Sequence, residues 1–201
     1  MALNKTPKIL FFDLGGVIVP WVGMEALAKF NNMTREEVSA RFDASDIFRA
    51  FERGTASEAD FFEELPRLFN LPDTDVSALW NSWVRAPYPG TLEALADLKT
   101  RFTTACLSNT NPVHWAHLNR MFNTGETFHH AFASHEIGAA KPDLESYIKP
   151  LGIMGSQSSE VWFFDDTEAN IDGARAAGLT AFHVNRSVGV LPTLRTLKLI
   201  P

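Results

Sequence analysis

The chain has one cysteine, no cluster of positive charge and no long apolar segment, and each absence excludes a class of protein. With Cys106 alone, no internal disulfide framework can form. No window approaches the roughly 18 uninterrupted apolar residues of a membrane-spanning helix, so we expect no membrane partner. The formal net charge is −6, and without concentrated Lys and Arg we expect no binding to nucleic acid or to an anionic membrane surface.

The remaining composition is typical of a globular protein that acts on small molecules. Its 201 residues, 45% of them hydrophobic, can bury a core in one domain or in a domain with a smaller lobe. Cys106 lies in an apolar run, so we expect it to be a buried thiol. A free thiol suits a reducing compartment, and we therefore expect a cytoplasmic location. The run before Asp13 lacks a cleavage site and is interpreted as a first strand. We expect a monomer or a homodimer, with Trp115 as an exposed aromatic residue suited to a dimer contact.

The most informative segment is Phe-Phe-Asp-Leu-Gly-Gly-Val-Ile-Val, residues 11–19, in which an apolar strand pattern stops at one carboxylate with two glycines close behind it. Glycine permits close approach of the backbone. This strand end would therefore present the Asp13 side chain and bare carbonyl groups to a ligand. A strand followed by an ordinary turn fits the same residues, because short motifs have many false matches.

Polar groups follow or flank three further apolar runs. Ser108 and Asn109 come directly after residues 103–107, and Asp165 and Asp166 come directly after residues 161–164. Lys141 and Pro142 lie a few residues beyond the run 131–134. Ligands of open parallel sheets bind at the carboxyl ends of the strands. We therefore expect Asp13, Ser108 and the Asp165–Asp166 pair to converge in space.

These segments resemble the four motifs of the haloacid dehalogenase superfamily of hydrolases. The matching residues are Asp13 in Phe-Phe-Asp-Leu-Gly, Ser108 in Leu-Ser-Asn, Lys141 in Lys-Pro, and the acids of Phe-Phe-Asp165-Asp166. The resemblance spans nearly the whole chain. Residues 51–54, 107–111 and 163–170 are most similar to the subgroup that contains glucose 1-phosphate phosphatases and the phosphatase domain of soluble epoxide hydrolases.

The hydrophobic pattern predicts strands that alternate with helices, interrupted by one helical insert. Further strands are expected at 102–107, 131–134, 161–164 and 180–184, which implies a parallel sheet. Residues 20–87 read as short amphipathic helices, and Pro87-Tyr88-Pro89-Gly90 ends them. The predicted class is α/β: a Rossmann-like parallel sheet core formed by residues 1–19 and 88–201, with an all-helical cap at 20–87.

Attack of Asp13 on a phosphate dianion would meet a repulsion of about 8 kcal/mol at ~4 Å and an effective dielectric constant near 20. Lys141 supplies one positive charge, and placing Asp165 and Asp166 beside Asp13 makes sense only with a bound divalent cation. Mg²⁺ is the expected cofactor because it prefers hard oxygen ligands. The expected ligands are Asp13, the Gly15 carbonyl and Asp166, with Asp165 direct or through water, and the resemblance implies the same set.

The predicted reaction is hydrolysis of a small phosphorylated metabolite, with sugar phosphates among the candidates. The Ser108 hydroxyl and the Asn109 backbone N–H are expected to hold phosphate oxygens. Lys141 is expected to orient Asp13 and to offset charge in the transition state. The phosphoryl group would pass to Asp13 and then to water, so Asp13 and Lys141 are the catalytic candidates.

One residue departs from the motif, because phosphatases of this superfamily usually have a second aspartate two positions after the nucleophile, where this chain has Gly15. General acid–base catalysis contributes about 10²–10⁴-fold. Loss of this general acid and base predicts a slower enzyme, or one restricted to anomeric, acyl or aryl phosphates, whose leaving groups need little protonation. The glucose 1-phosphate phosphatases share this glycine, and a cap residue is another source of the proton.

Two other functions remain open at this stage. A 2-haloacid dehalogenase uses the same aspartate to displace halide and needs no second acid, so Gly15 fits it, as does Tyr147 six residues after Lys141. Asp165 and Asp166 count against it, since two more carboxylates would repel an anionic haloacid at a metal-free site. The third alternative is a binding domain that has lost turnover, because fold alone does not settle function.

Three residues near the motifs are expected to support the site. Trp21 lies in the loop from Asp13 toward the cap and is expected to contact substrate. Asn111 is expected to touch substrate as well, and Asn170 to hydrogen-bond the metal-site carboxylates. The resemblance adds a role in cap closure for the segment Glu52-Arg53-Gly54, which ends a helix.

Other conspicuous side chains have structural interpretations. His114 and His117 have no Cys or acidic partner at ligand spacing, so we expect them to be surface or interface residues rather than metal ligands. Trp80 and Trp83 sit at helical spacing and are expected in the cap core. Helix starts are expected at Thr34 and Ser57, and at Asp73 or Thr74 before Trp80.

Overall fold

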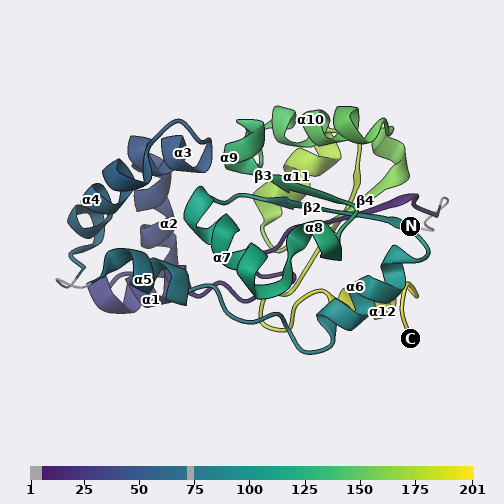
Figure 1. Ribbon diagram of the computed structural model, residues 1–201, viewed down its shortest axis with the longest axis horizontal. Helices are drawn as coiled ribbons and strands as arrows, with labels where there is room; N and C mark the ends of the chain where they lie inside the picture. The colour runs from purple at the N-terminus through teal and green to yellow at the C-terminus, as the bar shows by residue number, and fades with distance from the viewer. Residues whose placement is uncertain (1–5, 72–74) are drawn as a thin grey trace.

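The computed structural model describes residues 6–71 and 75–201, and its centre is a five-stranded parallel sheet (Figure 1). The strand order is β3-β2-β1-β4-β5. The strands are β1 (Ile9–Phe12), β2 (Thr103–Ser108), β3 (His130–Ala133), β4 (Val161–Asp165) and β5 (Thr180–His183). All four residues of β1 are buried, as expected for the middle strand of a sheet that helices cover on both faces.

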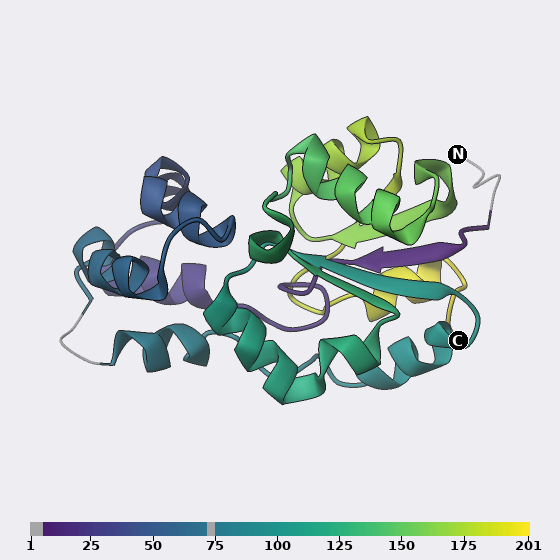
Figure 2. The same cartoon turned by 45° about the horizontal axis from the view of Figure 1, so that its top comes forward.

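The helices form a layer on each face of the sheet (Figure 2). One layer contains α6 (Thr91–Lys99), α7 (Pro112–Phe122), α8 (Thr124–Thr127) and α12 (Leu191–Thr196), and the other contains α10 (Leu144–Met154) and α11 (Glu168–Ala176). Two short turns, α9 (Ser134–Ile137) and η1 (Ser158–Glu160), complete the connections. Successive β1 side chains point to opposite layers, because Leu10 and Phe12 pack with α6, α7 and α12, whereas Ile9 and Phe11 pack with α10 and α11. The predicted α/β class is confirmed.

Five more helices lie together beyond the carboxyl ends of the strands (Figure 1). They are α1 (Gly23–Asn31), α2 (Arg35–Ala44), α3 (Asp46–Glu52), α4 (Glu58–Phe69) and α5 (Val76–Ser82). We call them the cap. The predicted N-caps of α2 and α4 are confirmed, since Thr34 forms a capping box with Glu37 and Ser57 accepts a hydrogen bond from the Asp60 N–H. Asp73 and Thr74 lie outside the described residues, and Asp75 caps α5.

The cap has an apolar core of its own, in which aromatic rings dominate. Trp80 and Trp83 are both buried there, as the sequence predicted. Trp80 makes edge contacts with Phe61 at 5.0 Å and with Trp83 at 5.4 Å between ring centroids. Such pairs add to the free energy gained by burial alone.

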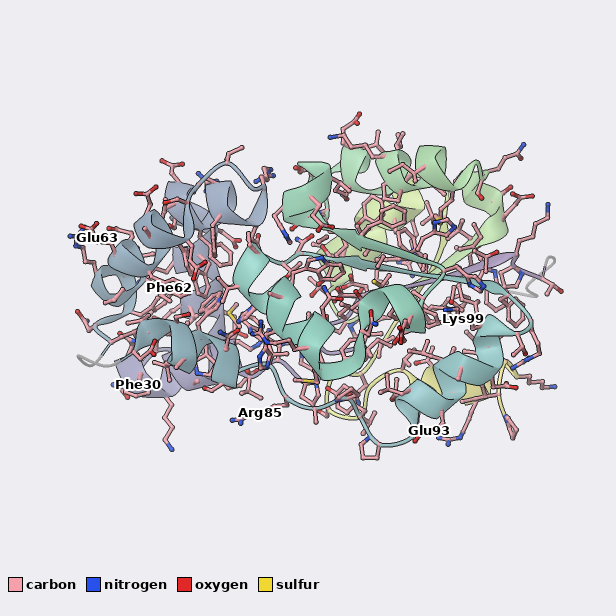
Figure 3. The ribbon with its side chains drawn as sticks, in the orientation of Figure 1. Phe30, Phe62, Glu63, Arg85, Glu93 and Lys99 are labelled. Carbon is pink, nitrogen blue, oxygen red and sulfur yellow. The ribbon has the colours of Figure 1, made fainter. Side chains whose placement is uncertain are left out.

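Two chain crossings join the cap to the sheet layers, and they are hydrogen-bonded to each other. The Val22 N–H donates to the Trp83 carbonyl and the Arg85 N–H donates to the Pro20 carbonyl, both at 2.9 Å. Figure 3 labels Arg85 on the second crossing. These bonds place the crossings near residues 20–22 and 83–85, and the division into a core of 1–19 and 88–201 with a cap of 20–87 stays a prediction.

Two expectations about α7 are wrong. His114 is buried rather than on the surface, because its ring stacks on Trp80 at 4.7 Å and its Nε2 lies 2.9 Å from the Trp80 carbonyl oxygen. Burial lowers the pKa of His114 to about 4, so the imidazole is neutral. Trp115 is also buried, and its indole donates to Glu136 at 3.1 Å, so it offers no dimer contact. His117 is half-buried.

None of the helices within residues 6–71 and 75–201 is long and apolar enough to cross a membrane.

Two helical glycines differ in the space around them, and this difference gives a matched test of the packing. A Cβ on Gly173 in α11 would lie 2.6 Å from the Pro142 carbonyl oxygen, whereas a Cβ on exposed Gly152 in α10 would meet nothing within 4 Å. We expect Gly173→Ala to lower Tm by about 2–6 °C through overpacking. Gly152→Ala should raise Tm by up to about 4 °C through helix propensity. Thermal unfolding measures both, and a Tm for Gly173→Ala at or above wild type would contradict the close contact.

Candidate active site

The candidate site lies where the three middle strands end. Asp13 follows β1 directly, Ser108 is the last residue of β2, and Asp165 is the last residue of β4. The register pairs Phe12 of β1 with Cys106 of β2 and with Phe164 of β4, so these ends lie side by side. The convergence expected from the sequence is therefore present in the structure.

Lys141 is the buried cation of this edge. Its Nζ lies 2.7 Å from Asp13 Oδ1 and 2.7 Å from Asp165 Oδ2. Burial works to lower its pKa, but the charges of Asp13 and Asp165 outweigh burial and hold the pKa above its usual value, so the ammonium group stays charged. The Asn109 side chain fixes the Lys141 backbone, since its amide donates to the Lys141 carbonyl and its oxygen accepts from the Lys141 N–H, each at 2.8 Å.

Three carboxylates lie together at this edge, and two of them contact Lys141. Asp13, Asp165 and Asp166 each place one oxygen within 4.8 Å of the others. Burial, only partly offset by Lys141, raises the pKa of Asp13 to about 7. Burial and the charge of Asp165 raise the pKa of Asp166 to about 6. The site therefore has a deficit of positive charge when all three groups are ionised.

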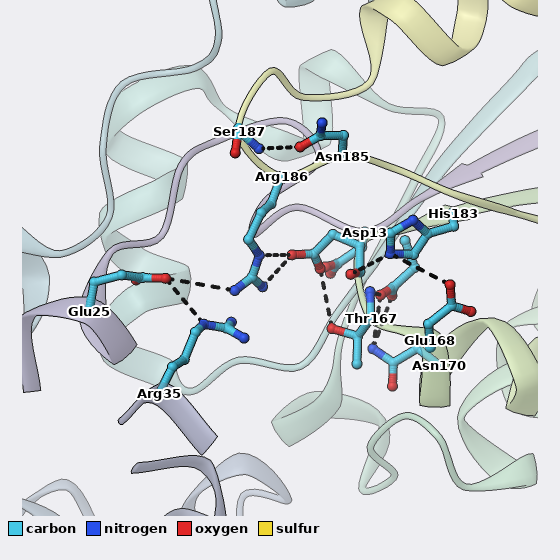
Figure 4. Close-up of polar contacts among 12 residues, drawn as sticks. Asp13, Glu25, Arg35, Thr167, Glu168, Asn170, His183, Asn185, Arg186 and Ser187 are labelled. Atoms are coloured by element: carbon cyan, nitrogen blue, oxygen red, sulfur yellow. Dashed lines mark hydrogen bonds and ion pairs between the residues drawn. The ribbon is translucent and has the colours of Figure 1, made fainter. Parts of the chain in front are cut away.

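Different sets of residues hold the two neighbouring aspartates, and Figure 4 labels three of these partners, Thr167, Asn170 and Arg186. Both oxygens of Asp165 are bonded within the protein, to Lys141, to the Thr167 N–H at 2.9 Å and to the Asn170 amide at 3.0 and 3.1 Å. Asp166 is held by Arg186, whose Nε donates to Oδ2 at 2.7 Å and whose Nη2 donates to the same oxygen, and the Thr167 hydroxyl donates to Oδ1 at 3.3 Å. The Asn170 contact is the one expected from the sequence.

Arg186 links this edge to the cap and was not predicted. Its Nη1 lies 3.9 Å from Glu25 of α1, and Arg35 of α2 donates to the same Glu25 oxygen at 3.1 Å (Figure 4). Arg186 follows β5 outside any recognisable motif. Only the fold, which returns the chain to the strand ends after β5, brings it to Asp166.

The residues present fit a hard divalent cation. Crowded carboxylates with raised pKa values are oxygen donors of the kind that Mg²⁺ prefers. Both oxygens of Asp165 and both oxygens of Asp166 have partners within the protein. The expected ligand set of Asp13, the Gly15 carbonyl and Asp166, with Asp165 direct or through water, stays a prediction. At Gly16 (φ +76°), a Cβ would collide with the Asp166 carboxylate, so the turn after Asp13 closes tightly over this acid.

A cavity of about 420 Å³ lies between the strand ends and the cap. Asp13, Ser108, Lys141 and Asp166 line it from the sheet side. Ser108 makes no side-chain hydrogen bond to any described residue, so its hydroxyl is available to a ligand. The cap and the crossings to it contribute both apolar and polar residues to the lining: the apolar ones are Val19, Trp21, Met24, Phe42, Phe48, Trp80 and Val84, and the polar ones are Arg35, Ser39, Asp43 and Glu52.

Trp21 and Asn111 both line the cavity, but they differ in what they offer a ligand. The Trp21 indole N–H is buried without a partner among the described residues. The Asn111 oxygen caps α7 by accepting from the His114 N–H at 3.0 Å, and its amide nitrogen has no partner among the described residues. Gly15 also lines the cavity, and a Cβ there would meet only Trp21 Cβ at 3.7 Å. Packing therefore does not require the glycine.

The comparison with known families agrees with this geometry. Residues 7–178 match the haloacid dehalogenase-like hydrolases. The chain belongs to this family. The finer resemblance to glucose 1-phosphate phosphatases stays a prediction.

Individual relatives extend over nearly the whole hydrolase. A sesquiterpene phosphatase, astK, from Aspergillus oryzae is 27% identical over 199 residues, which cover 96% of this chain and 97% of that protein. A HAD family enzyme from Bacteroides thetaiotaomicron, solved with magnesium and inorganic phosphate, has a TM-score of 0.73 at 26% identity and covers 88% of this chain and 93% of its own. The L-2-haloacid dehalogenase of Xanthobacter autotrophicus is 20% identical with a TM-score of 0.62, over 89% of this chain and 78% of its own, and shows the fold alone.

Metal binding by the hydrolase should depend on pH in a defined direction. Folding raises the pKa of Asp13 from 3.8 to about 7 and that of Asp166 from 3.8 to about 6, so the folded protein binds more protons than the unfolded chain between these values. Stability from these groups is therefore lost as pH rises from about 4 to about 7, and we expect a lower Tm of the metal-free hydrolase at about pH 8 than at about pH 5. Mg²⁺ at about 100 times its Kd should raise Tm by about 5–10 °C at the higher pH, and by less at the lower. Thermal unfolding with Mg²⁺ or chelator at matched ionic strength measures this, and identical curves near pH 8 would contradict a metal site.

Proposed function

We propose that this hydrolase is a Mg²⁺-dependent phosphatase that acts on a small phosphate monoester through an aspartyl-phosphate on Asp13. The observation that carries the proposal is the grouping of Asp13, Asp165 and Asp166 around Lys141 beside the open Ser108 hydroxyl. Three carboxylates suit a site that holds a divalent cation and receives a phosphate. The phosphatase from Aspergillus oryzae and the magnesium and phosphate complex from Bacteroides thetaiotaomicron support the same reaction class.

Each residue has one task in this reaction. Asp13 attacks phosphorus, with Lys141 holding its carboxylate in place at 2.7 Å. The Ser108 hydroxyl and the Asn109 backbone N–H hold phosphate oxygens, and the Asn109 side chain keeps Lys141 in register. Bound Mg²⁺ would supply the positive charge that lets a phosphate dianion approach Asp13. Water then releases phosphate from Asp13.

A 2-haloacid dehalogenase is the less favoured reading of the same nucleophile. It would place an anionic substrate beside two further carboxylates with no cation except Lys141 and the surrounding arginines. Tyr147 is compatible with a dehalogenase and with a phosphatase. Its side chain is fully buried and its hydroxyl donates to the Asn170 carbonyl at 2.7 Å, so its role here is structural. A binding domain without turnover is also less favoured, because Lys141, Asp13 and Ser108 are all in place around the cavity.

The cavity supports a substrate with an apolar organic group more than a sugar phosphate. A sugar needs several hydrogen-bonding partners. The cap side offers polar groups at Arg35, Ser39, Asp43 and Glu52, and aromatic and aliphatic side chains make up the rest of its lining. The relative from Aspergillus oryzae is a sesquiterpene phosphatase, and sesquiterpenes are hydrocarbon-rich compounds. We therefore place farnesyl phosphate ahead of α-glucose 1-phosphate as a model substrate.

The substrate class is tested by one panel, in which farnesyl phosphate, α-glucose 1-phosphate, p-nitrophenyl phosphate and 2-chloropropionate are each assayed with Mg²⁺ and with excess chelator. We expect phosphate release that requires Mg²⁺, with kcat/KM for farnesyl phosphate at least about tenfold above that for glucose 1-phosphate, a difference of about 1.4 kcal/mol. Chloride release that persists in chelator would instead establish a dehalogenase.

Removal of the nucleophile gives the accompanying control. Asp13→Asn should abolish phosphate release, because the amide cannot form the aspartyl-phosphate. Glu93→Gln is the matched carboxyl-to-amide change on the exposed face of α6 (Figure 3) and should leave the rate unchanged. Full activity of Asp13→Asn would contradict the proposed chemistry.

A further inference from the structure

Gly15 leaves the sheet side of the site without a second acid, and the cap supplies a carboxyl group to the same cavity. Glu52, the last residue of α3, lines the cavity together with Asp13 and Lys141. Its side chain has no hydrogen bond or ion pair with any of the described residues. A partly buried carboxyl group with no protein partner beside a reacting centre is available for proton transfer.

Three residues near Glu52 in the sequence, Phe51, Arg53 and Gly54, are each held by a tertiary contact and fix its position. Phe51 is buried in the cap core and stacks on Phe61 with 4.3 Å between ring centroids. Arg53 Nη2 lies 2.6 Å from Asp143 Oδ2, two residues after Lys141. Gly54 has φ +72°, and a Cβ there would collide with the His135 carbonyl oxygen. Residues 51–54 therefore dock the cap onto the loop that carries Lys141, with Glu52 held over the enclosed space.

The charges around Glu52 suit a group that both gives and takes a proton. Burial raises its pKa to about 7, while Arg53 and Lys141 act to lower the pKa and Asp43 acts to raise it. Arg35 lines the same cavity from α2. Glu52 and Lys141 line the same cavity as Asp13, which places the Glu52 carboxyl group in the space where a substrate would bind. An acid that titrates near neutral pH is efficient in both directions of proton transfer.

We propose that Glu52 is the general acid and base of the reaction and fills, from the cap, the role that Gly15 leaves unfilled on the sheet; this inference rests on the proposed phosphatase function. As Asp13 forms its bond to phosphorus, the bond from phosphorus to the ester oxygen breaks, and the Glu52 carboxyl proton passes to that oxygen to give the free alcohol. In the second step the Glu52 carboxylate accepts a proton from the attacking water. Phosphate leaves, and both Asp13 and Glu52 return to their starting states.

This assignment changes the expected substrate range. Without a proton donor, the site would be limited to activated leaving groups such as aryl phosphates. With Glu52 in place, the phosphate ester of an ordinary aliphatic alcohol becomes a substrate. Such an alcohol also matches the apolar lining of the cavity.

The test compares Glu52→Gln with wild type on decyl phosphate, whose leaving group needs a proton, and on p-nitrophenyl phosphate, whose leaving group does not. The measured quantity is kcat/KM with Mg²⁺, because it reports the steps up to loss of the leaving group. We expect Glu52→Gln to lose about 10²-fold or more on decyl phosphate and only a few-fold on p-nitrophenyl phosphate. Asp46→Asn, the same chemical change at an exposed residue of α3, should alter neither.

The pH profile separates proton transfer from a structural role. Wild-type kcat/KM for decyl phosphate should fall as pH rises through about 7, where Glu52 loses its proton, and this fall should be absent in Glu52→Gln. Equal losses on both substrates, or an unchanged alkaline limb, would overturn the assignment while leaving the phosphatase function intact. A wild-type protein that hydrolyses neither ester with Mg²⁺ would overturn the phosphatase function and the assignment together.

Discussion

The arrangement of this hydrolase depends on one electrostatic constraint, which is that three carboxylates converge on one buried ammonium. Lys141 bridges Asp13 and Asp165 at 2.7 Å each, and Arg186 holds Asp166 from the side of the cap. Burial, with the charges of neighbouring carboxylates, raises the pKa of Asp13 and Asp166. Further positive charge would favour the ionised form of both groups, and Mg²⁺ is the ion that suits their oxygen atoms.

The parallel sheet creates this constraint and the cap makes use of it. Residues separated by about 150 positions meet because β1, β2 and β4 end at the same edge. The cap then encloses a cavity over that edge, fixed by Arg53 on Asp143 and by the paired crossings near residues 20–22 and 83–85. Apolar cap residues over the strand ends strengthen electrostatic interactions there and limit the access of water during phosphoryl transfer.

The sequence predicted the parts of the molecule that rest on local pattern. Alternating strand and helix runs located every strand to within one residue in the described part of the chain, and the Thr34 and Ser57 caps were found from their side chains. Long-range packing was not predictable in the same way. His114 and Trp115 looked like surface residues, yet α7 packs against both α5 and the sheet, and both side chains are buried. No local sequence pattern indicates the contact of Arg186 with Asp166 or the hydrogen bonds between Asn109 and Lys141. Both contacts form only when the fold brings distant loops together.

The claim at the centre of this account is that Asp13 accepts a phosphoryl group in a reaction that needs the ion. The most direct measurement is acid quench of the enzyme during turnover of a phosphate ester, followed by peptide mass spectrometry with Mg²⁺ and with chelator. The account predicts phosphate attached to Asp13 in the presence of Mg²⁺ and none with chelator. An Asp13 that stays unmodified through turnover, or one that carries phosphate equally well in chelator, would contradict it.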